Sequence, residues 1–81
     1  MAHYVYLIKT IKPYKQKSYV GYTRNLTKRL KNHNLGKGAK STRGYKWVLI
    51  YKRYFKDKIK AMSYEYKLKN DRNKRYKILN K

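Results

Sequence analysis

The sequence predicts an α+β fold, with a small three-stranded β-sheet flanked by helices in the order β-β-α-β-α-α. Two runs of β-branched and aromatic residues lie near the N-terminus, and three later segments have helical spacing. An apolar, aromatic stretch separates the first helical segment from the other two. With 81 residues, the chain has the length of one domain, and we expect that domain to cover residues 1–81.

The N-terminal segment predicts a β-hairpin. Residues 4–8 are rich in β-formers and alternate aromatic and aliphatic side chains. A turn segment carrying Pro13 follows, and residues 18–22 predict a second short strand. Tyr6 and Tyr19 then lie on neighbouring strands and can point to the same face, although packing is the ordinary role of a strand tyrosine.

The first helix predicts an unusual mixture of side chains on its inward face. Thr23 or Asn25 can cap this helix, which extends for about ten residues and ends at Gly36. At about 100° per residue, one inward stripe contains two leucines, an arginine and a histidine. These residues are Leu26, Arg29, Leu30 and His33. An arginine in such a place is often solvated or snorkels from the edge of the stripe, so a chemical and a structural role both stay open.

A basic loop and a third strand follow. Residues 36–44 form a loop by composition, with three glycines and the cations Lys37, Lys40 and Arg43. Trp47–Phe55 is apolar and aromatic on both faces at its start, so it predicts a mostly buried third strand.

The second helix places a carboxylate on its apolar face. Asp57 can cap this helix, and a last short helix is expected from about Asp71 to Leu79. The buried stripe of the second helix is predicted to contain Ala61, Met62 and Leu68. Glu65 lies inside this stripe, and a carboxylate there needs a partner cation or a metal. An ion pair with Lys69, four residues further on, is the ordinary alternative.

The charge of the chain indicates a polyanionic partner. It has 24 basic and 3 acidic residues, a net charge of +21, which favours nucleic acid through counterion release. An AT-rich genome would supply part of the lysine excess but does not explain the shortage of aspartate and glutamate. Binding to a membrane surface or to the ribosome is the alternative.

There is no cysteine, no signal-peptide pattern and no apolar run of the roughly 20 residues that a membrane span needs, so we expect a cytoplasmic protein.

The motifs of the chain follow one another at spacings typical of a known family. The first is Tyr4-Val5-Tyr6 and the second is Tyr19-Val20-Gly21; Arg29 follows Gly21 by eight residues, and His33 follows Arg29 by four. This ordered set, with Glu65 at the centre of residues 61–69, resembles the GIY-YIG endonuclease superfamily. The loop at residues 36–44 is similar to that of its small stand-alone branch, related to the nuclease module of bacterial excision repair.

Three features depart from the family pattern. The first motif has Tyr-Val-Tyr in place of Gly-Ile-Tyr, and Tyr22 stands where the excision-repair branch often has lysine. Many members also carry an active-site asparagine about twelve or more residues after the glutamate. Only Asn80 is available in that region, because Asn70 and Asn73 come too early. We therefore assign that role to no residue.

The resemblance implies a metal-dependent DNA endonuclease. Two-metal nucleases need several carboxylates, whereas Asp57 and Asp71 are expected to be helix caps, so a single Mg²⁺ or Mn²⁺ is the implied cofactor. The resemblance makes Glu65 its ligand and places Arg29 on the scissile phosphate. The implied roles of the other residues are as follows: Tyr19 acts on the attacking water as base or relay, Tyr6 orders that tyrosine or water, His33 accepts or passes on the proton, Gly21 is structural, and Lys37, Lys40 and Arg43 bind nucleic acid.

Two alternatives stay open at this point. The same fold can serve as a non-catalytic module that binds nucleic acid through charge and tyrosine stacking. A structural RNA-binding protein, such as a ribosomal one, is supported by size and charge. The expected substrate is DNA, in single-stranded, branched or duplex form, with RNA as the alternative.

Overall fold

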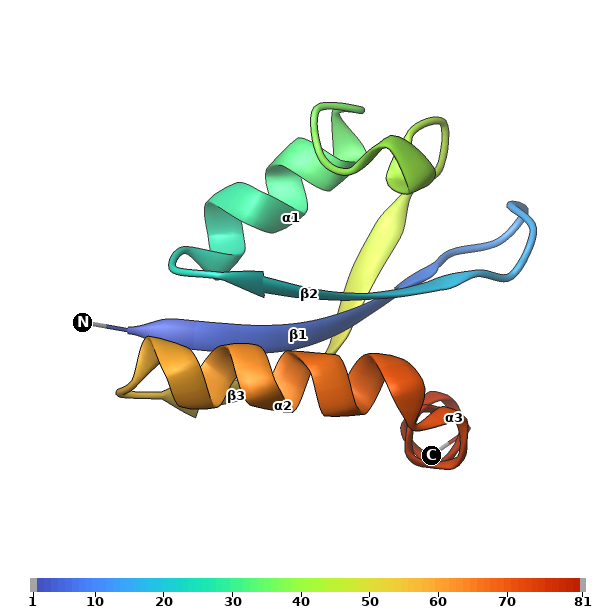
Figure 1. Ribbon diagram of the computed structural model, residues 1–81. Helices are drawn as coiled ribbons and strands as arrows, with labels where there is room; N and C mark the ends of the chain where they lie inside the picture. Colours follow the sequence, from blue (N-terminus) through green and yellow to red (C-terminus); the bar gives the residue numbers. More distant parts are fainter. Residues whose placement is uncertain (1, 81) are drawn as a thin grey trace.

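The computed structural model describes residues 2–80 and has the predicted α+β architecture (Figure 1). Met1 and Lys81, the ends of the expected domain, lie outside the described residues. The elements are β1 (His3–Thr10), β2 (Ser18–Thr23), α1 (Leu26–Asn34), the 3-10 helix η1 (Lys40–Thr42), β3 (Trp47–Phe55), α2 (Lys58–Asn70) and α3 (Arg72–Leu79). The predicted order β-β-α-β-α-α is confirmed.

The antiparallel sheet has β1 at its centre, in the order β2-β1-β3. Figure 1 shows α1 on one face of the sheet and α2 on the other. Alternate side chains of β1 therefore enter two separate cores, which explains why most of this strand is buried. Under α1 the buried residues are Tyr6, Ile8 and Trp47, and under α2 they are Val5, Leu7, Val20, Ala61 and Leu68.

Polar side chains cap the helices as the sequence predicts. The side chains of Asn25, Asp57 and Asp71 accept hydrogen bonds from backbone N–H groups in the first turns of α1, α2 and α3. The helix α1 ends two residues before the predicted Gly36, which adopts a positive φ of 77°. The N–H groups of Gly36 and Lys37 bond back to the carbonyls of His33 and Asn32, and these two bonds end the helix in a Schellman motif.

Two burial predictions are wrong. Within β3 only Trp47 is buried, because β3 is an edge strand in which four side chains are partly covered and four are exposed. Met62 is 40% exposed, while Ala61 and Leu68 are buried. Met62 lies about 100° around the helix from Ala61, on the side that turns away from the sheet. Within residues 2–80, no helix is long and apolar enough to cross a bilayer.

Candidate active site

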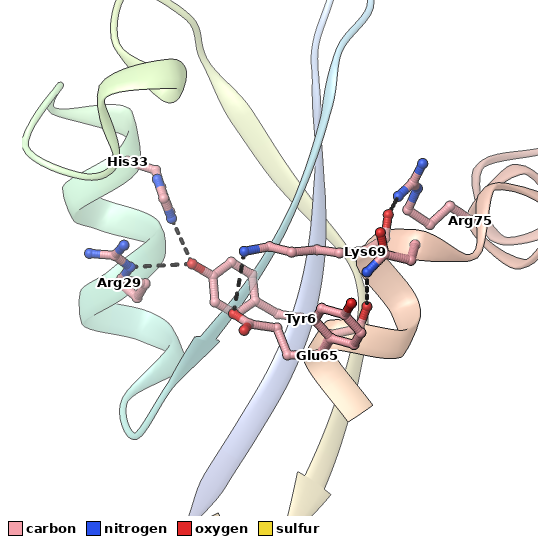
Figure 2. Close-up of polar contacts among 8 residues, drawn as sticks. Tyr6, Arg29, His33, Glu65, Lys69 and Arg75 are labelled. Carbon is pink, nitrogen blue, oxygen red and sulfur yellow. Dashed lines mark hydrogen bonds and ion pairs between the residues drawn. The ribbon is translucent and has the colours of Figure 1, made fainter. Parts of the chain in front are cut away.

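Tyr6, Arg29 and His33 meet between α1 and the sheet (Figure 2), and Tyr19, a fourth predicted site residue, packs beside them. The hydroxyl of Tyr6 lies 2.7 Å from Nε2 of His33, and Nε of Arg29 donates to the same hydroxyl at 3.2 Å. The Tyr19 ring packs edge-on against the His33 ring, with centroids 5.1 Å apart, and lies 6.4 Å from the Tyr6 ring. The structure thus brings Tyr6, Tyr19, Arg29 and His33 into one cluster.

The strand register places the two tyrosines on the same face. In the antiparallel ladder Tyr6 lies opposite Gly21 and Tyr19 lies opposite Ile8, so both side chains point toward α1. A side chain at Gly21 would collide with the Tyr6 hydroxyl. Glycine at this position therefore lets Tyr6 lie across β2.

The helix α1 supplies the other two side chains. Arg29 and His33 are four residues apart and lie on the same side of the helix as the two leucines, which pack in the core below. His33 is completely buried, and Arg29 is half-buried. The predicted inward stripe of α1 is therefore confirmed, and the histidine is its most deeply buried member.

Burial determines the protonation of this cluster. Desolvation raises the pKa of Tyr6 to about 12, against the opposing effect of Arg29. Desolvation also lowers the pKa of His33 to about 4, and the charge of Arg29 adds to this effect. The hydrogen bond to Tyr6 raises the pKa of Arg29. At neutral pH the cluster therefore contains a protonated tyrosine, a neutral histidine and a cationic arginine.

Glu65 reaches the same region from α2. Its side chain is 15% exposed, and its charge contributes to the raised pKa of Tyr6, so the carboxylate lies within electrostatic range of the tyrosine (Figure 2). The predicted alternative is also present, because Nζ of Lys69 lies 4.0 Å from Oε2 of Glu65. Lys69 is 49% exposed, so solvent screens its side of this long pair and weakens the attraction.

The donor set fits one divalent ion. Among residues 2–80 no three histidine, cysteine or acidic side chains cluster, so a cage built wholly from protein ligands is absent from this part of the chain. A single carboxylate suits a hard cation that keeps waters and shares phosphate oxygens with the protein. Asn80 follows the end of α3, where its side-chain amide donates to the Tyr76 carbonyl.

The loop after α1 contributes two residues that sequence reasoning missed. Gly38 lies against the His33 ring, where a Cβ would collide with Nδ1. Thr42 is completely buried, and its Oγ1 lies 2.9 Å from Nδ1 of His33. A serine–threonine pair between a lysine and an arginine in a glycine-rich segment was the available signal. The loop cations Lys37, Lys40 and Arg43 are exposed, as expected.

Comparison with known proteins identifies this class of fold. Residues 2–77 match the family profile described as the GIY-YIG catalytic domain, so the chain belongs to the GIY-YIG family, which is of nuclease type. It is 45% identical to a UPF0213 protein of Staphylococcus haemolyticus over 69 residues, which are 83% of this chain and 79% of that protein. It is 44% identical to a UPF0213 protein of Clostridium perfringens over 80 residues, 95% of this chain and 82% of that protein.

A solved structure is also similar. The solution NMR structure of the UPF0213 protein BH0048 from Bacillus halodurans has 38% sequence identity and a TM-score of 0.49. The match covers 98% of this chain and 82% of that chain.

Proposed function

We propose that this chain is a metal-dependent DNA endonuclease that hydrolyses phosphodiester bonds with one metal ion. The supporting observation is that Arg29 and the two tyrosines meet under α1, while Glu65 comes within electrostatic range of Tyr6 from α2. A nuclease site needs donors for a phosphate, a group that takes a proton from water, and a carboxylate for a cation. The cluster supplies the first two, and Glu65 on α2 supplies the carboxylate.

Arg29 is the phosphate-binding group in this proposal. Its Nε–H is used on Tyr6, which orients the guanidinium plane and directs the terminal amino groups to a substrate. A planar fork can bind two phosphate oxygens and offset the charge that develops on them in the transition state.

Tyr19 is the better of the two tyrosines for work on the attacking water. Tyr6 is buried with its pKa raised to about 12, which disfavours the phenolate, so Tyr6 serves to order its neighbours. Tyr19 is half-buried and lies next to both Tyr6 and His33. In this scheme Tyr19 takes or relays the proton of the water, and His33, whose Nε2 lies against the Tyr6 hydroxyl, is reached through Tyr6.

Glu65 would hold the metal ion. Mg²⁺ or Mn²⁺ at this place would supply a Lewis acid for a phosphate oxygen. Release of Lys69 from the carboxylate costs little, because the pair is long and partly exposed. No other acidic side chain is required for a single ion that keeps most of its waters.

A nicking assay tests the proposed activity. Purified protein should convert supercoiled plasmid to the nicked form with Mg²⁺ or Mn²⁺, and excess EDTA should stop the reaction. A panel of single-stranded, branched and duplex DNA, together with RNA, would then define the substrate. Absence of cleavage across this panel, in either metal, would contradict the proposal.

A non-catalytic nucleic-acid-binding module is the second candidate. The observation that favours it is the Glu65–Lys69 ion pair, which compensates the carboxylate without a metal. The same panel separates the two functions, because a binding module would retain the substrate at all metal concentrations and cleave none of it.

The loop cations give a prediction about binding. Lys37, Lys40 and Arg43 are exposed beside the C-terminal end of α1, so we expect them to contact phosphates near the cut. Replacing all three by alanine should weaken binding and lower the slope of log K against log salt by about three at most. The cleavage rate at saturating DNA should stay within about tenfold, because none of the three belongs to the cluster that provides phosphate and water chemistry.

A titration at several salt concentrations checks this. The intact protein should lose about a thousandfold in affinity between 50 and 200 mM salt if roughly six phosphates are neutralised. If the triple variant keeps the affinity and the salt slope of the intact protein, the loop is only a connector between α1 and β3.

A further inference from the structure

The hydrogen bonds around His33 form a chain between a group that can only donate and a group that can only accept. At one end, Arg29 has only donors, and its Nε–H points to the Tyr6 hydroxyl oxygen. At the other end, the carbonyl of Ala39 only accepts, and Oγ1 of Thr42 donates to it at 2.8 Å. His33 lies between these ends and contacts both hydroxyls.

These ends determine the tautomer of His33. Thr42 has one hydroxyl proton, and it is used on the Ala39 carbonyl, so Oγ1 must accept from Nδ1–H of His33. The ring is neutral, with its pKa lowered to about 4, so Nε2 carries a lone pair and accepts from the Tyr6 hydroxyl. Free histidine in water favours the opposite tautomer, with the proton on Nε2, and here the partner at Nδ1 decides.

The loop holds Thr42 in place for this task. Thr42 is completely buried, its carbonyl accepts from Nε1 of Trp47 at 3.0 Å, and its N–H also bonds to the Ala39 carbonyl at 3.0 Å. Gly38 lies against the same ring, next to Nδ1. Thr42 is hydrogen-bonded through its backbone N–H, its carbonyl and its hydroxyl, so its side chain has one orientation. A basic loop that only contacts solvent would not require this.

We propose that Thr42 is a positioning residue: its hydroxyl holds His33 as the Nδ1–H tautomer, which directs the Tyr6 proton to His33 and leaves the Tyr6 oxygen to accept from Arg29. The loop between α1 and β3 thus orients the Arg29 guanidinium indirectly. Thr42 contacts His33, His33 contacts Tyr6, and Tyr6 contacts Arg29. The consequence for cleavage rests on the proposed nuclease function, whereas the consequence for the tautomer and for Arg29 does not.

The first test uses the unaltered protein and needs no substrate. Nitrogen-15 NMR at pH 7 should show a protonated Nδ1 and an unprotonated Nε2 for His33, with His3, the other histidine, assigned from a His3→Gln variant. The Nε proton of Arg29 should exchange slowly with solvent, because it is bonded to a buried hydroxyl. A protonated Nε2 on His33 in the intact protein would overturn the proposal.

The second test compares three variants at the 3-10 helix. Thr42→Val keeps the shape but has no hydroxyl, so it should lose the Nδ1–H tautomer and the slow exchange of the Arg29 proton. Thr42→Ser should restore both. Ser41→Ala changes an exposed hydroxyl in the same turn and should alter neither. Thermal unfolding identifies conditions in which each variant is folded.

Cleavage gives the final readout. Thr42→Val should lower kcat by about tenfold or more, in the range of other residues that orient a functional group, with little change in the Kd for DNA. If Thr42→Val only destabilised the fold, the folded fraction would not lose kcat while keeping its Kd for DNA. Nor would Thr42→Ser specifically restore the rate. A Thr42→Val protein that keeps the tautomer and the slow Arg29 exchange overturns the proposal, and so does one that loses both yet cleaves at the rate of the intact protein. If the intact protein cuts no nucleic acid, the proposed function fails while the NMR tests still decide the role of Thr42.

Discussion

Replacing Glu65 by glutamine should abolish metal-dependent cleavage and leave DNA binding nearly unchanged. Glutamine has almost the same shape but lacks the charge that a hard cation requires, so the Lewis acid is lost. The 24 basic residues that attract the phosphates are untouched, and the affinity for DNA should stay within about threefold. Cleavage should fall to the background of the assay at every Mg²⁺ concentration.

Lys69 offers a matched control for this variant. If Glu65 serves only the ion pair with Lys69, then Lys69→Met should resemble Glu65→Gln in every assay. If Glu65 holds a metal, Lys69→Met should cleave DNA normally or at lower Mg²⁺, because a competing cation has been removed. Line broadening by Mn²⁺ in NMR spectra should affect residues around Glu65 in the intact protein and spare them in Glu65→Gln. Full cleavage by Glu65→Gln in Mg²⁺ would refute the metal assignment.

The sequence contained enough information to place one half of the site. Arg29 and His33 fall on the leucine stripe of a helix, and the alternation of β1 and β2 brings Tyr6 and Tyr19 to one face; both expectations are confirmed. These relations depend only on the period of a helix or strand, which local sequence determines. The sequence could assign Gly21 a structural role but could not explain it, because the explanation is that the Tyr6 hydroxyl crosses β2 at this position.

Contacts between distant elements could not be predicted in the same way. The roles of Gly38 and Thr42 arise because an irregular loop folds back on a buried ring, and no periodicity describes such a loop. The exposure of β3 follows from its place at the sheet edge, which the order of elements does not specify. Likewise, the approach of Glu65 to Tyr6 depends on how α2 packs against the sheet.

Replacing Arg29 by lysine should remove most of the activity although the charge is retained. Arg29 would perform two tasks in the proposed site: its Nε–H binds Tyr6, and its terminal amino groups would bind the phosphate. An ammonium is a single point with three donors, so it cannot keep the tyrosine contact and bind two phosphate oxygens at once. Loss of one directed donor to a transition-state oxyanion costs about 10²–10³ in kcat, and we expect a loss of this size.

The measurement is single-turnover cleavage at saturating DNA, with the Kd determined separately. Since the charge is unchanged, Arg29→Lys should bind DNA with nearly the affinity of the intact protein, and the loss should lie in kcat. Arg72→Lys, at the exposed start of α3, is the matched control and should have no effect on either quantity. A near-normal rate for Arg29→Lys would mean that Arg29 contributes only charge, and that the bond from its Nε to Tyr6 has no part in cleavage.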